Sequence, residues 1–347
     1  MKRNIVSLLV LLLLLLAIPC WKIFGPSLHQ PEGKFFYIHT GATYAQVKDS
    51  LVKEKIISNS FWFDKVAKQL KYPSLVKPGK YQVQEHMSVM ALVRMLRNGR
   101  QTPVNMVISR KLRFREDLAK LAGQYFEFDS AAMYTYLSKQ ENLQSFGVDS
   151  ATFITAVLPD TYTFFWNTTP QKVYTRLYEE SQKFWTPERK EKARSLGLSP
   201  QQVYTLASIV EEETRYGPDK PKIASVYLNR LNKNMPLEAD PTAKFALKDF
   251  GLTRIYYSHL KVESPYNTYK NKGLPPGPIC MVQKSTIDSV LNAPKTDYIF
   301  FVADSDFSGR SVFTTNYKDH QAYAKAFSKA QDSVAKLRQQ RMENTDK

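Results

Sequence analysis

Three consecutive glutamates, Glu211, Glu212 and Glu213, follow an apolar segment that begins at Leu206, and Thr214 comes directly after them. A carboxyl group at the border of an apolar surface loses hydration, which disfavours its charged form. Its pKa then rises toward the range in which one group can both donate and accept a proton. The stretch could therefore support general acid–base catalysis. The alternative is an acidic run that forms a solvated helix end and carries no chemistry.

The glutamates are expected to lie at the end of a helix with one buried face. Apolar residues recur before them at three- and four-residue spacings, at Val203, Leu206, Ala207 and Val210. At about 100° per residue, Glu212 falls nearly opposite this stripe, and we expect it to be solvated. Glu211 and Glu213 fall on the two borders of the stripe. Periodicity alone does not choose between them as the acid.

Other catalytic motifs are absent from the sequence. There is no nucleophile elbow, no His-Glu-x-x-His and no phosphate-binding loop, and the five histidines lack metal-ligand spacing. Two Ser-x-x-Lys matches, Ser74/Lys77 and Ser333/Lys336, lack the companion motifs of penicillin-binding enzymes and are attributed to chance. We therefore expect neither a metal nor a cofactor.

The composition indicates a folded, basic protein. A chain of 347 residues with 43% hydrophobic residues can bury a large core, and its length favours two or three domains. Only two cysteines occur, Cys20 and Cys280, so no disulfide framework is expected. The formal charge of +17 implies an anionic neighbour, for which nucleic acid, acidic lipid and a carboxylate-bearing wall polymer compete. No nucleic-acid-binding motif occurs, and the apolar N-terminal segment described next, which would direct the chain across a membrane, also argues against nucleic acid as the partner.

The first 26 residues are expected to form a cytoplasmic tip and a membrane anchor. The apolar run Ile5–Trp21 has near-minimal length for a transmembrane helix, and no small-x-small cleavage site follows it. A signal peptide is the alternative, and Pro19 argues against lipid modification of Cys20. Lys2 and Arg3 predict a cytoplasmic N-terminus. The chain would then be a single-pass protein of the plasma (inner) membrane with an extracytoplasmic, periplasmic body.

Residues 32–102 are predicted to form a small α/β module. The patterns indicate a strand, two helices, a strand and a helix, at Lys34–His39, Tyr44–Ile57, Phe61–Leu70, Gly79–Val83 and Ser88–Leu96. This order resembles the LysM-like modules that bind glycan chains of peptidoglycan. A structural spacer without a ligand is the alternative, because the order of elements does not define a site.

Residues 103–347 are predicted to form a larger, mixed α+β domain. Strands are expected at 103–108, 298–302 and 311–315, the last two as a hairpin. Helices are expected at 114–125, 171–184, 222–231 and 318–341, besides the glutamate helix that follows Ser199-Pro200. The aromatic segment 158–166 is predicted to be a loop whose rings either join the core or stack on sugars.

Several motifs follow the glutamates in a fixed order. They are Val-x-x-Asn-Arg-Leu, Leu-x-x-Asp-Pro-Thr, Tyr-Asn-Thr-Tyr and Gly-Leu-Pro-Pro-Gly-x-Ile, and Ala-Ser-Ile-Val-Glu-x-Glu-Thr precedes them. Together they cover roughly residues 158–316. The series strongly resembles the MltG/YceG family of endolytic murein transglycosylases, and the predicted anchor and LysM-like module agree with it.

The resemblance implies a function and a site. The glutamate before the threonine is the catalytic one in that family, which corresponds to Glu213 here, with Glu211 held in reserve. Supporting or substrate-binding residues are expected at Asn229, Asp240, Asn267 and Tyr269, and the alternative for each is a hydrogen bond that braces a loop. The implied substrate is the peptidoglycan glycan strand, cut between MurNAc and GlcNAc to leave 1,6-anhydro-MurNAc ends. Peptidoglycan synthases or division proteins are implied partners.

Two other functions remain open at this stage. A hydrolytic muramidase could use Asp240 as a second carboxylate beside Glu213. A non-catalytic scaffold for wall binding or division would keep the glutamates only as structural groups. The first differs from a transglycosylase in adding water to the product, and the second in forming no product.

Overall fold

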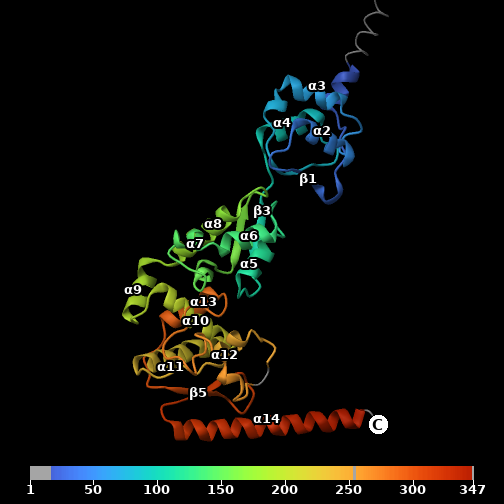
Figure 1. Cartoon of the computed structure of the whole chain (residues 1–347). Helices are drawn as coiled ribbons and strands as arrows, with labels where there is room; N and C mark the ends of the chain where they lie inside the picture. The colour runs from blue at the N-terminus through green and yellow to red at the C-terminus, as the bar shows by residue number, and fades with distance from the viewer. Residues whose placement is uncertain (1–16, 253–254, 346–347) are drawn as a thin grey trace, which may run out of the picture. The chain divides into compact units, whose positions relative to one another are not determined.

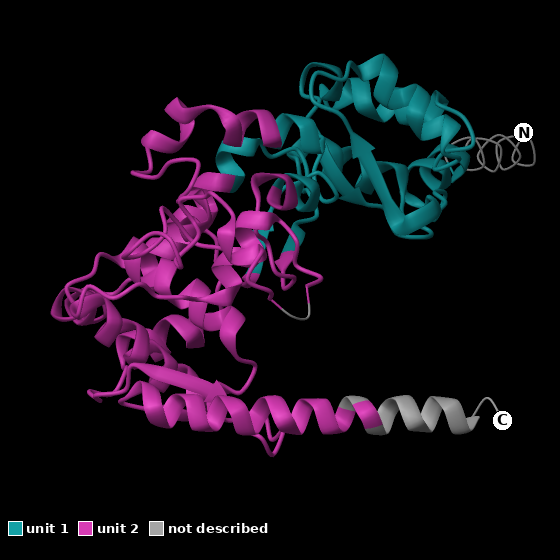
Figure 2. Ribbon diagram, turned by 60° about the horizontal axis from the view of Figure 1, so that its bottom comes forward, with its two compact units in different colours: residues 1–106, 119–133, 161–173 teal, residues 107–118, 134–160, 174–347 magenta. Residues whose placement is uncertain are grey.

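The computed structural model describes residues 17–252 and 255–345, which separate into two compact units. Unit 1 comprises residues up to 106, 119–133 and 161–173, and unit 2 comprises 107–118, 134–160 and 174 onward (Figure 2). Most of the predicted anchor Ile5–Trp21 lies outside the described residues. Among the helices that are described, none has both the length and the apolar character needed to cross a bilayer. The domain boundaries at 26, 32 and 102 stay predictions.

The N-terminal part of unit 1 has the predicted order of elements. Strand β1 (Phe35–Ile38) pairs antiparallel with β2 (Gly79–Gln82). Helices α2 (Tyr44–Lys53) and α3 (Phe61–Gln69) lie between the strands in sequence, and α4 (Val89–Asn98) follows them. Short 3-10 turns occupy Glu32–Lys34 and Tyr72–Ser74. The order strand, helix, helix, strand, helix is confirmed, whereas the LysM-like identity of the module stays a prediction.

Strand alternation divides the small sheet into a buried face and an open face. Phe36, Ile38 and Tyr81 are at most 2% exposed and join one core cluster with the helices. Tyr37 and Lys80 are directly opposite each other across the two strands and point to the other face, because successive side chains in a strand alternate. Tyr37 is 39% exposed, so this face is not covered by the module's own helices.

The middle of the chain contains a second small sheet and several helices. Strand β3 (Val104–Ile108) pairs with β4 (Asp160–Phe164), which lies in the segment predicted to be a loop. The loop prediction was wrong because Leu158-Pro159 lies in the short connection before β4 and does not extend into it. Tyr162 is buried as a strand residue. The remaining elements are α5 (Arg115–Ala122), α6 (Ser130–Ser138), α7 (Gln140–Gln144), a 3-10 turn (Phe153–Ala156) and α8 (Pro170–Phe184).

Helix α10 (Pro200–Glu213) is the centre of unit 2 (Figure 1). It packs against α9 (Pro187–Ser195), α11 (Lys220–Asn232), α12 (Asp240–Leu247) and α13 (Lys284–Leu291). Every residue from Val203 to Val210 is buried, so the helix is covered on all sides and has no solvated face along that stretch. The predicted amphipathic pattern therefore describes only part of its contacts.

The C-terminal part of unit 2 contains the predicted hairpin and tail helix. Strand β5 (Phe300–Ala303) pairs antiparallel with β6 (Ser311–Thr314), and α14 (Tyr317–Thr345) packs on both. Both predictions are confirmed, with ends that differ by a few residues. Single 3-10 turns also occur at Gly217–Asp219 and His259–Lys261.

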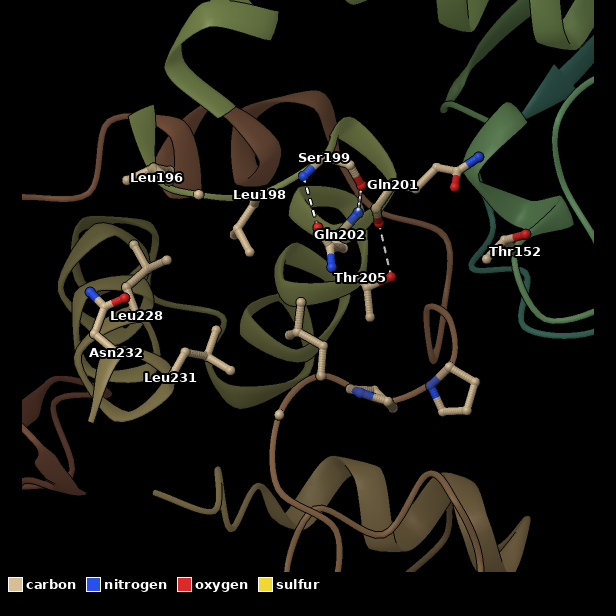
Figure 3. Close-up of a pocket in the computed structure, with 15 residues that line it drawn as sticks. Thr152, Leu196, Leu198, Ser199, Gln201, Gln202, Thr205, Leu228, Leu231 and Asn232 are labelled. Atoms are coloured by element: carbon tan, nitrogen blue, oxygen red, sulfur yellow. Dashed lines mark hydrogen bonds between the residues drawn. The ribbon is translucent and has the colours of Figure 1, made fainter. Parts of the chain in front are cut away.

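The start of α10 is fixed by a reciprocal cap, which Figure 3 shows. The Ser199 backbone N–H donates to Gln202 Oε1 at 2.8 Å, and the Gln202 backbone N–H donates to Ser199 Oγ at 3.2 Å. A hollow of about 670 Å³ lies beside this end, bordered by Leu228, Leu231 and Pro275 among others. None of its bordering side chains titrates near neutral pH.

The Gly-Leu-Pro-Pro-Gly-x-Ile motif forms a strap across α10. The Ile279 backbone N–H donates to Ser208 Oγ at 3.0 Å, and the Val282 backbone N–H donates to Tyr204 Oη at 3.2 Å. At Gly277, a Cβ atom would lie 2.1 Å from the carbonyl oxygen of Ala151. The strap can approach this backbone only because residue 277 has no side chain.

We expect Gly277→Ala to destabilise the protein by about 1–3 kcal/mol, because the added methyl group overlaps backbone that cannot move independently. Gly217→Ala is the matched control, since a Cβ there meets nothing within 4 Å. Chemical denaturation of both variants measures the difference. Equal stabilities of the two variants would contradict the role given to Gly277.

Candidate functional site

The site is built at the C-terminal end of α10. The helix ends at Glu213 because Thr214 is extended, with φ −144° and ψ 144°. A helix C-terminus carries a partial negative charge of about half an elementary charge, which disfavours nearby anions. Three adjacent carboxyl groups at this end therefore need either compensating cations or a proton.

Glu211 is held in a buried ion pair. Lys220 Nζ lies 3.0 Å from Glu211 Oε2 and also donates to Thr286 Oγ1 at 2.7 Å. The Thr286 hydroxyl in turn donates to the same Glu211 oxygen. The side chains of Glu211 and Lys220 are only 11% and 13% exposed. Glu211 thus connects α10 to α11 and α13.

Glu212 is also ion-paired, which corrects the prediction that it is solvated. Its side chain is 18% exposed, and it accepts hydrogen bonds from Lys111 Nζ and from Arg113 Nη2, the latter at 2.9 Å. Burial alone would raise the pKa of Glu212, but the bonds from these two cations outweigh it and hold the pKa below its ordinary value. The prediction failed because a helical wheel does not include chain segments that cover the helix from elsewhere.

Arg113 is anchored on three sides. Its guanidinium donates to Glu212 and, through Nη1, to the Ile279 carbonyl at 3.2 Å, and it lies 4.1 Å from the centre of the Phe250 ring. Asp117 accepts from the backbone N–H groups of Arg113 and Phe114. The cation that neutralises Glu212 is therefore itself fixed by the strap and by α5.

Glu213 differs from its two neighbours in having no cationic partner. Among the residues that the structure describes, no lysine or arginine forms an ion pair with it, and Tyr227 Oη donates to Glu213 Oε1 at 2.5 Å. Burial raises the pKa of Glu213 to about 7, the Tyr227 hydrogen bond opposes this, and the charge of Asp240 adds to it. The residue remains partly exposed. A reacting molecule can therefore meet a carboxyl that titrates near neutral pH.

Tyr227 is a site residue that the sequence analysis missed. It lies on α11, is 2% exposed, and its ring meets Phe301 of β5 edge-on at 5.9 Å. Burial and the adjacent Glu213 raise the pKa of Tyr227 well above its ordinary value, so the phenol remains a donor. The motif Val-x-x-Asn-Arg-Leu contains this position as an unspecified residue. A buried tyrosine there gives no sequence signal that separates it from ordinary core.

Two of the predicted motifs interlock to position Asp240 and Tyr269. Thr242 Oγ1 and Thr268 Oγ1 are 2.8 Å apart, and Thr268 Oγ1 accepts from the Ala239 backbone N–H at 3.0 Å. This contact joins Asp-Pro-Thr to Tyr-Asn-Thr-Tyr. Tyr269 Oη consequently donates to Asp240 Oδ1 at 2.6 Å, and Asp240 is exposed. Asp240 and Tyr269 are thus brought together, and the charge of Asp240 acts on Glu213.

The two predicted asparagines make loop-bracing contacts. The Asn229 side-chain amide donates to the carbonyls of Thr296 and Tyr298 at 2.7 and 2.9 Å. The Asn267 amide is fully buried and donates to the carbonyls of Leu260 and Val262 at 2.8 and 2.9 Å. These contacts fit the alternative of loop bracing, and they orient α11 and the Tyr269 segment.

Within residues 17–252 and 255–345, no group of three or more His, Cys, Asp or Glu side chains is placed to hold a metal ion. The fold and the site together define a mixed α+β protein in which one of three carboxyl groups at the end of a buried helix forms no ion pair with any described residue. Residues 36–326 match the YceG-like family, and the chain belongs to that family. The resemblance seen in the sequence is thereby confirmed.

Similar proteins carry related names. A Bacillus subtilis protein named endolytic murein transglycosylase is 46% identical over 126 residues, which cover 35% of this chain and 33% of that protein. A Streptococcus pneumoniae protein of the same name is 27% identical over 82% of this chain and 56% of its own length. The chain thus spans a third to just over half of these relatives. A crystal structure of a YceG-like protein from Listeria monocytogenes is 26% identical, with a TM-score of 0.55, covering 83% of this chain and 98% of that one.

The environment of Glu213 predicts the pH dependence of stability. Its pKa rises from 4.5 in the unfolded chain to about 7 in the folded one, so its contribution to stability falls as pH rises through this window. We expect Glu213→Gln to raise the free energy of unfolding by about 1–2 kcal/mol at pH 8, after allowance for solvent screening, and to leave it unchanged at pH 4. Urea denaturation across the window measures this.

Glu212→Gln is the control with the opposite sign. The depressed pKa of Glu212 contributes stability above its unfolded pKa, and this contribution is lost as pH falls through the folded pKa. The variant should therefore be less stable than the parent at pH 8. A Glu213→Gln variant that loses stability at pH 8 as Glu212→Gln does would show that Glu213 is charged and compensated.

Proposed function

We propose that this chain is an endolytic lytic transglycosylase that cleaves the MurNAc–GlcNAc glycosidic bond within peptidoglycan glycan strands and leaves 1,6-anhydro-MurNAc ends. The observation that carries the proposal is the difference among the three glutamates. Glu211 and Glu212 are neutralised by cations, whereas Glu213 titrates near neutral pH and is partly exposed. The names of the Bacillus and Streptococcus relatives support the same reaction.

One carboxyl group is sufficient for this chemistry. As the bond between the MurNAc anomeric carbon and the glycosidic oxygen breaks, the Glu213 proton goes to that oxygen. The C6 hydroxyl oxygen of the same MurNAc forms the new bond to the anomeric carbon, and its proton goes to the Glu213 carboxylate. Glu213 ends the cycle protonated and no water is consumed.

The partners of Glu213 suit both steps. Burial raises the pKa of Glu213 to about 7, so a substantial fraction of the carboxyl is protonated near neutral pH, as a general acid requires. Once the proton has left, the Tyr227 hydroxyl donates to the carboxylate and limits the cost of its charge. Asp240 acts as a neighbouring charge that favours return of the proton. Tyr269 holds Asp240 in place through the bond between its hydroxyl and Asp240 Oδ1.

The location of the protein belongs to the same proposal. The apolar run Ile5–Trp21 would anchor the chain in the plasma (inner) membrane, with the N-terminus cytoplasmic and the body on the wall side. The formal charge of +17 suits a substrate that carries peptide carboxylates. Peptidoglycan synthases or division proteins are the proposed protein partners, because a nascent strand is reached where it is made.

We expect Glu213→Gln to lower strand cleavage by about 10²–10⁴-fold, because the amide cannot donate the proton. Glu179→Gln, an exposed glutamate on α8, is the control and should retain the parent rate. Liquid chromatography with mass spectrometry of purified strands measures the products. Products that contain an added water would identify a muramidase instead, and full activity of Glu213→Gln would remove the assignment.

Two substitutions should shift the pH dependence of cleavage in opposite directions. The reaction begins with protonated Glu213, so kcat/KM should fall above about pH 7. Tyr227→Phe removes the hydrogen bond that lowers the pKa of Glu213, so the decline in kcat/KM should move to higher pH. Asp240→Asn removes the negative charge that raises the pKa of Glu213, so the decline in kcat/KM should move to lower pH. The pH–rate curves of both variants check this, and shifts in the same direction would contradict it.

A further inference from the structure

Four aromatic side chains of unit 2 form a cluster at α12. Phe245, on this helix, contacts the other three, with ring centres 5.4 Å from Phe114, 6.3 Å from Phe250 and 4.7 Å from Tyr266. The centres of Phe114 and Phe250 are 6.0 Å apart. Phe250 is 39% exposed and the other three residues are partly buried, so the four-ring cluster keeps apolar surface accessible to a ligand.

The four-ring cluster lies next to the reaction site. Arg113, one of the two cations that neutralise Glu212, has its guanidinium 4.1 Å from the centre of the Phe250 ring. Tyr266 is the first tyrosine of the Tyr-Asn-Thr-Tyr motif, whose last tyrosine bonds to Asp240. The rings therefore belong to the same segments that hold Glu212 and Asp240 in place.

Lys244 adds a cation to this region. It follows Asp240 by one turn on α12, on the same face of the helix. Burial raises the pKa of Glu213 to about 7 and the charge of Lys244 opposes this, so the ammonium acts on the carboxyl. Lys220 and Lys111 are paired with glutamates. Lys244 is partly buried, but within the described part of the chain no group forms an ion pair or hydrogen bond with its ammonium.

The substrate of the proposed reaction carries a group that matches both features. The C3 oxygen of each MurNAc bears a lactyl group, to which the stem peptide is attached. The peptide is thus joined to the same sugar ring whose anomeric carbon meets Glu213, and it must leave the site close to that residue. Its carboxylates are attracted to the Lys244 ammonium, and its methyl side chains can bury apolar surface against the rings. A sugar without the peptide offers no anion to Lys244.

We propose that Lys244 and the four-ring cluster form a binding site for the acidic stem peptide of the MurNAc that reacts at Glu213. The identity of the ligand rests on the proposed function. Lys244 binds a carboxylate of the peptide, and the rings pack against its apolar side chains. The chain should therefore select strands that still carry their peptides and bind poorly to strands from which the peptides have been removed.

The test compares soluble strand fragments that carry stem peptides with the same fragments after an N-acetylmuramyl-L-alanine amidase has removed the peptides. Equilibrium titration of the full chain with Glu213→Gln measures binding without cleavage. We expect the peptide-bearing fragments to bind about tenfold more tightly, as one partly screened ion pair and ring contacts allow. Adding Lys244→Gln should reduce this preference to about threefold or less, whereas Lys244→Arg, which keeps the charge, should retain most of it.

The matched control is Lys233→Gln, which removes the same charge from an exposed position at the end of α11 and should keep the full preference. Phe250→Ala removes the most exposed ring of the cluster and should lower the preference. A second measurement uses chains with Glu213 present and takes the ratio of kcat/KM for the two kinds of fragment. The effect of Lys244 on the pKa of Glu213 is common to both substrates and cancels in this ratio, which should fall in Lys244→Gln as the binding preference does.

Each outcome decides the proposal. Equal binding of the two kinds of fragment, or a preference that Lys244→Gln leaves unchanged, would overturn it. Equal weakening of both kinds in Lys244→Gln would assign Lys244 to the sugar and also overturn it. A preference that depends on Lys244, in a chain that cuts no strand with Glu213 present, would support the peptide site and remove the proposed function. Cleavage of both kinds with equal kcat/KM would remove the peptide site and leave the proposed function standing.

Discussion

The negative end of helix α10 places three carboxyl groups in succession where each anionic charge is disfavoured by the helix itself. Lys220 compensates the first, and Lys111 with Arg113 compensates the second. Among the described residues, Glu213 has the Tyr227 phenol as its hydrogen-bond partner and forms no ion pair, so protonation limits its charge. The surrounding elements therefore position three cations, Lys220, Lys111 and Arg113, and one tyrosine, Tyr227.

Most residues of the co-linear sequence motifs position these cations and Tyr227, and few of them are placed to react with a substrate. The strap that contains Gly277 supplies the Ile279 carbonyl that holds Arg113. The asparagine and arginine at 229 and 230 both donate to carbonyls near β5, which keeps α11 and hence Tyr227 in place. The strap thus acts on Glu212 through Arg113, and the contacts of residues 229 and 230 act on Glu213 through Tyr227.

Local patterns predicted the elements whose contacts are local. The β5–β6 hairpin, the order of elements in the small module and the start of α10 at Ser199 all follow from turns, caps and alternation within a short stretch. The position of Glu212 could not be predicted in this way, because its partners Lys111 and Arg113 are 101 and 99 residues away. Tyr227 was missed for a related reason: only the packing of α11 on α10 distinguishes it from a core residue. Glu213 was selected by the family resemblance, and its contacts give an independent physical reason for the same choice.

The strap across α10 has a consequence for how the chain can vary in length. Gly277 is held against Ala151, and two residues later Ile279 uses both its N–H and its carbonyl, toward Ser208 and Arg113. Both ends of this short segment are held by contacts. Inserting or deleting one residue there would therefore displace either the close contact of Gly277 with Ala151 or the hydrogen bond from Arg113 to Ile279. Length changes in related chains should therefore accumulate in surface loops and leave this three-residue interval constant.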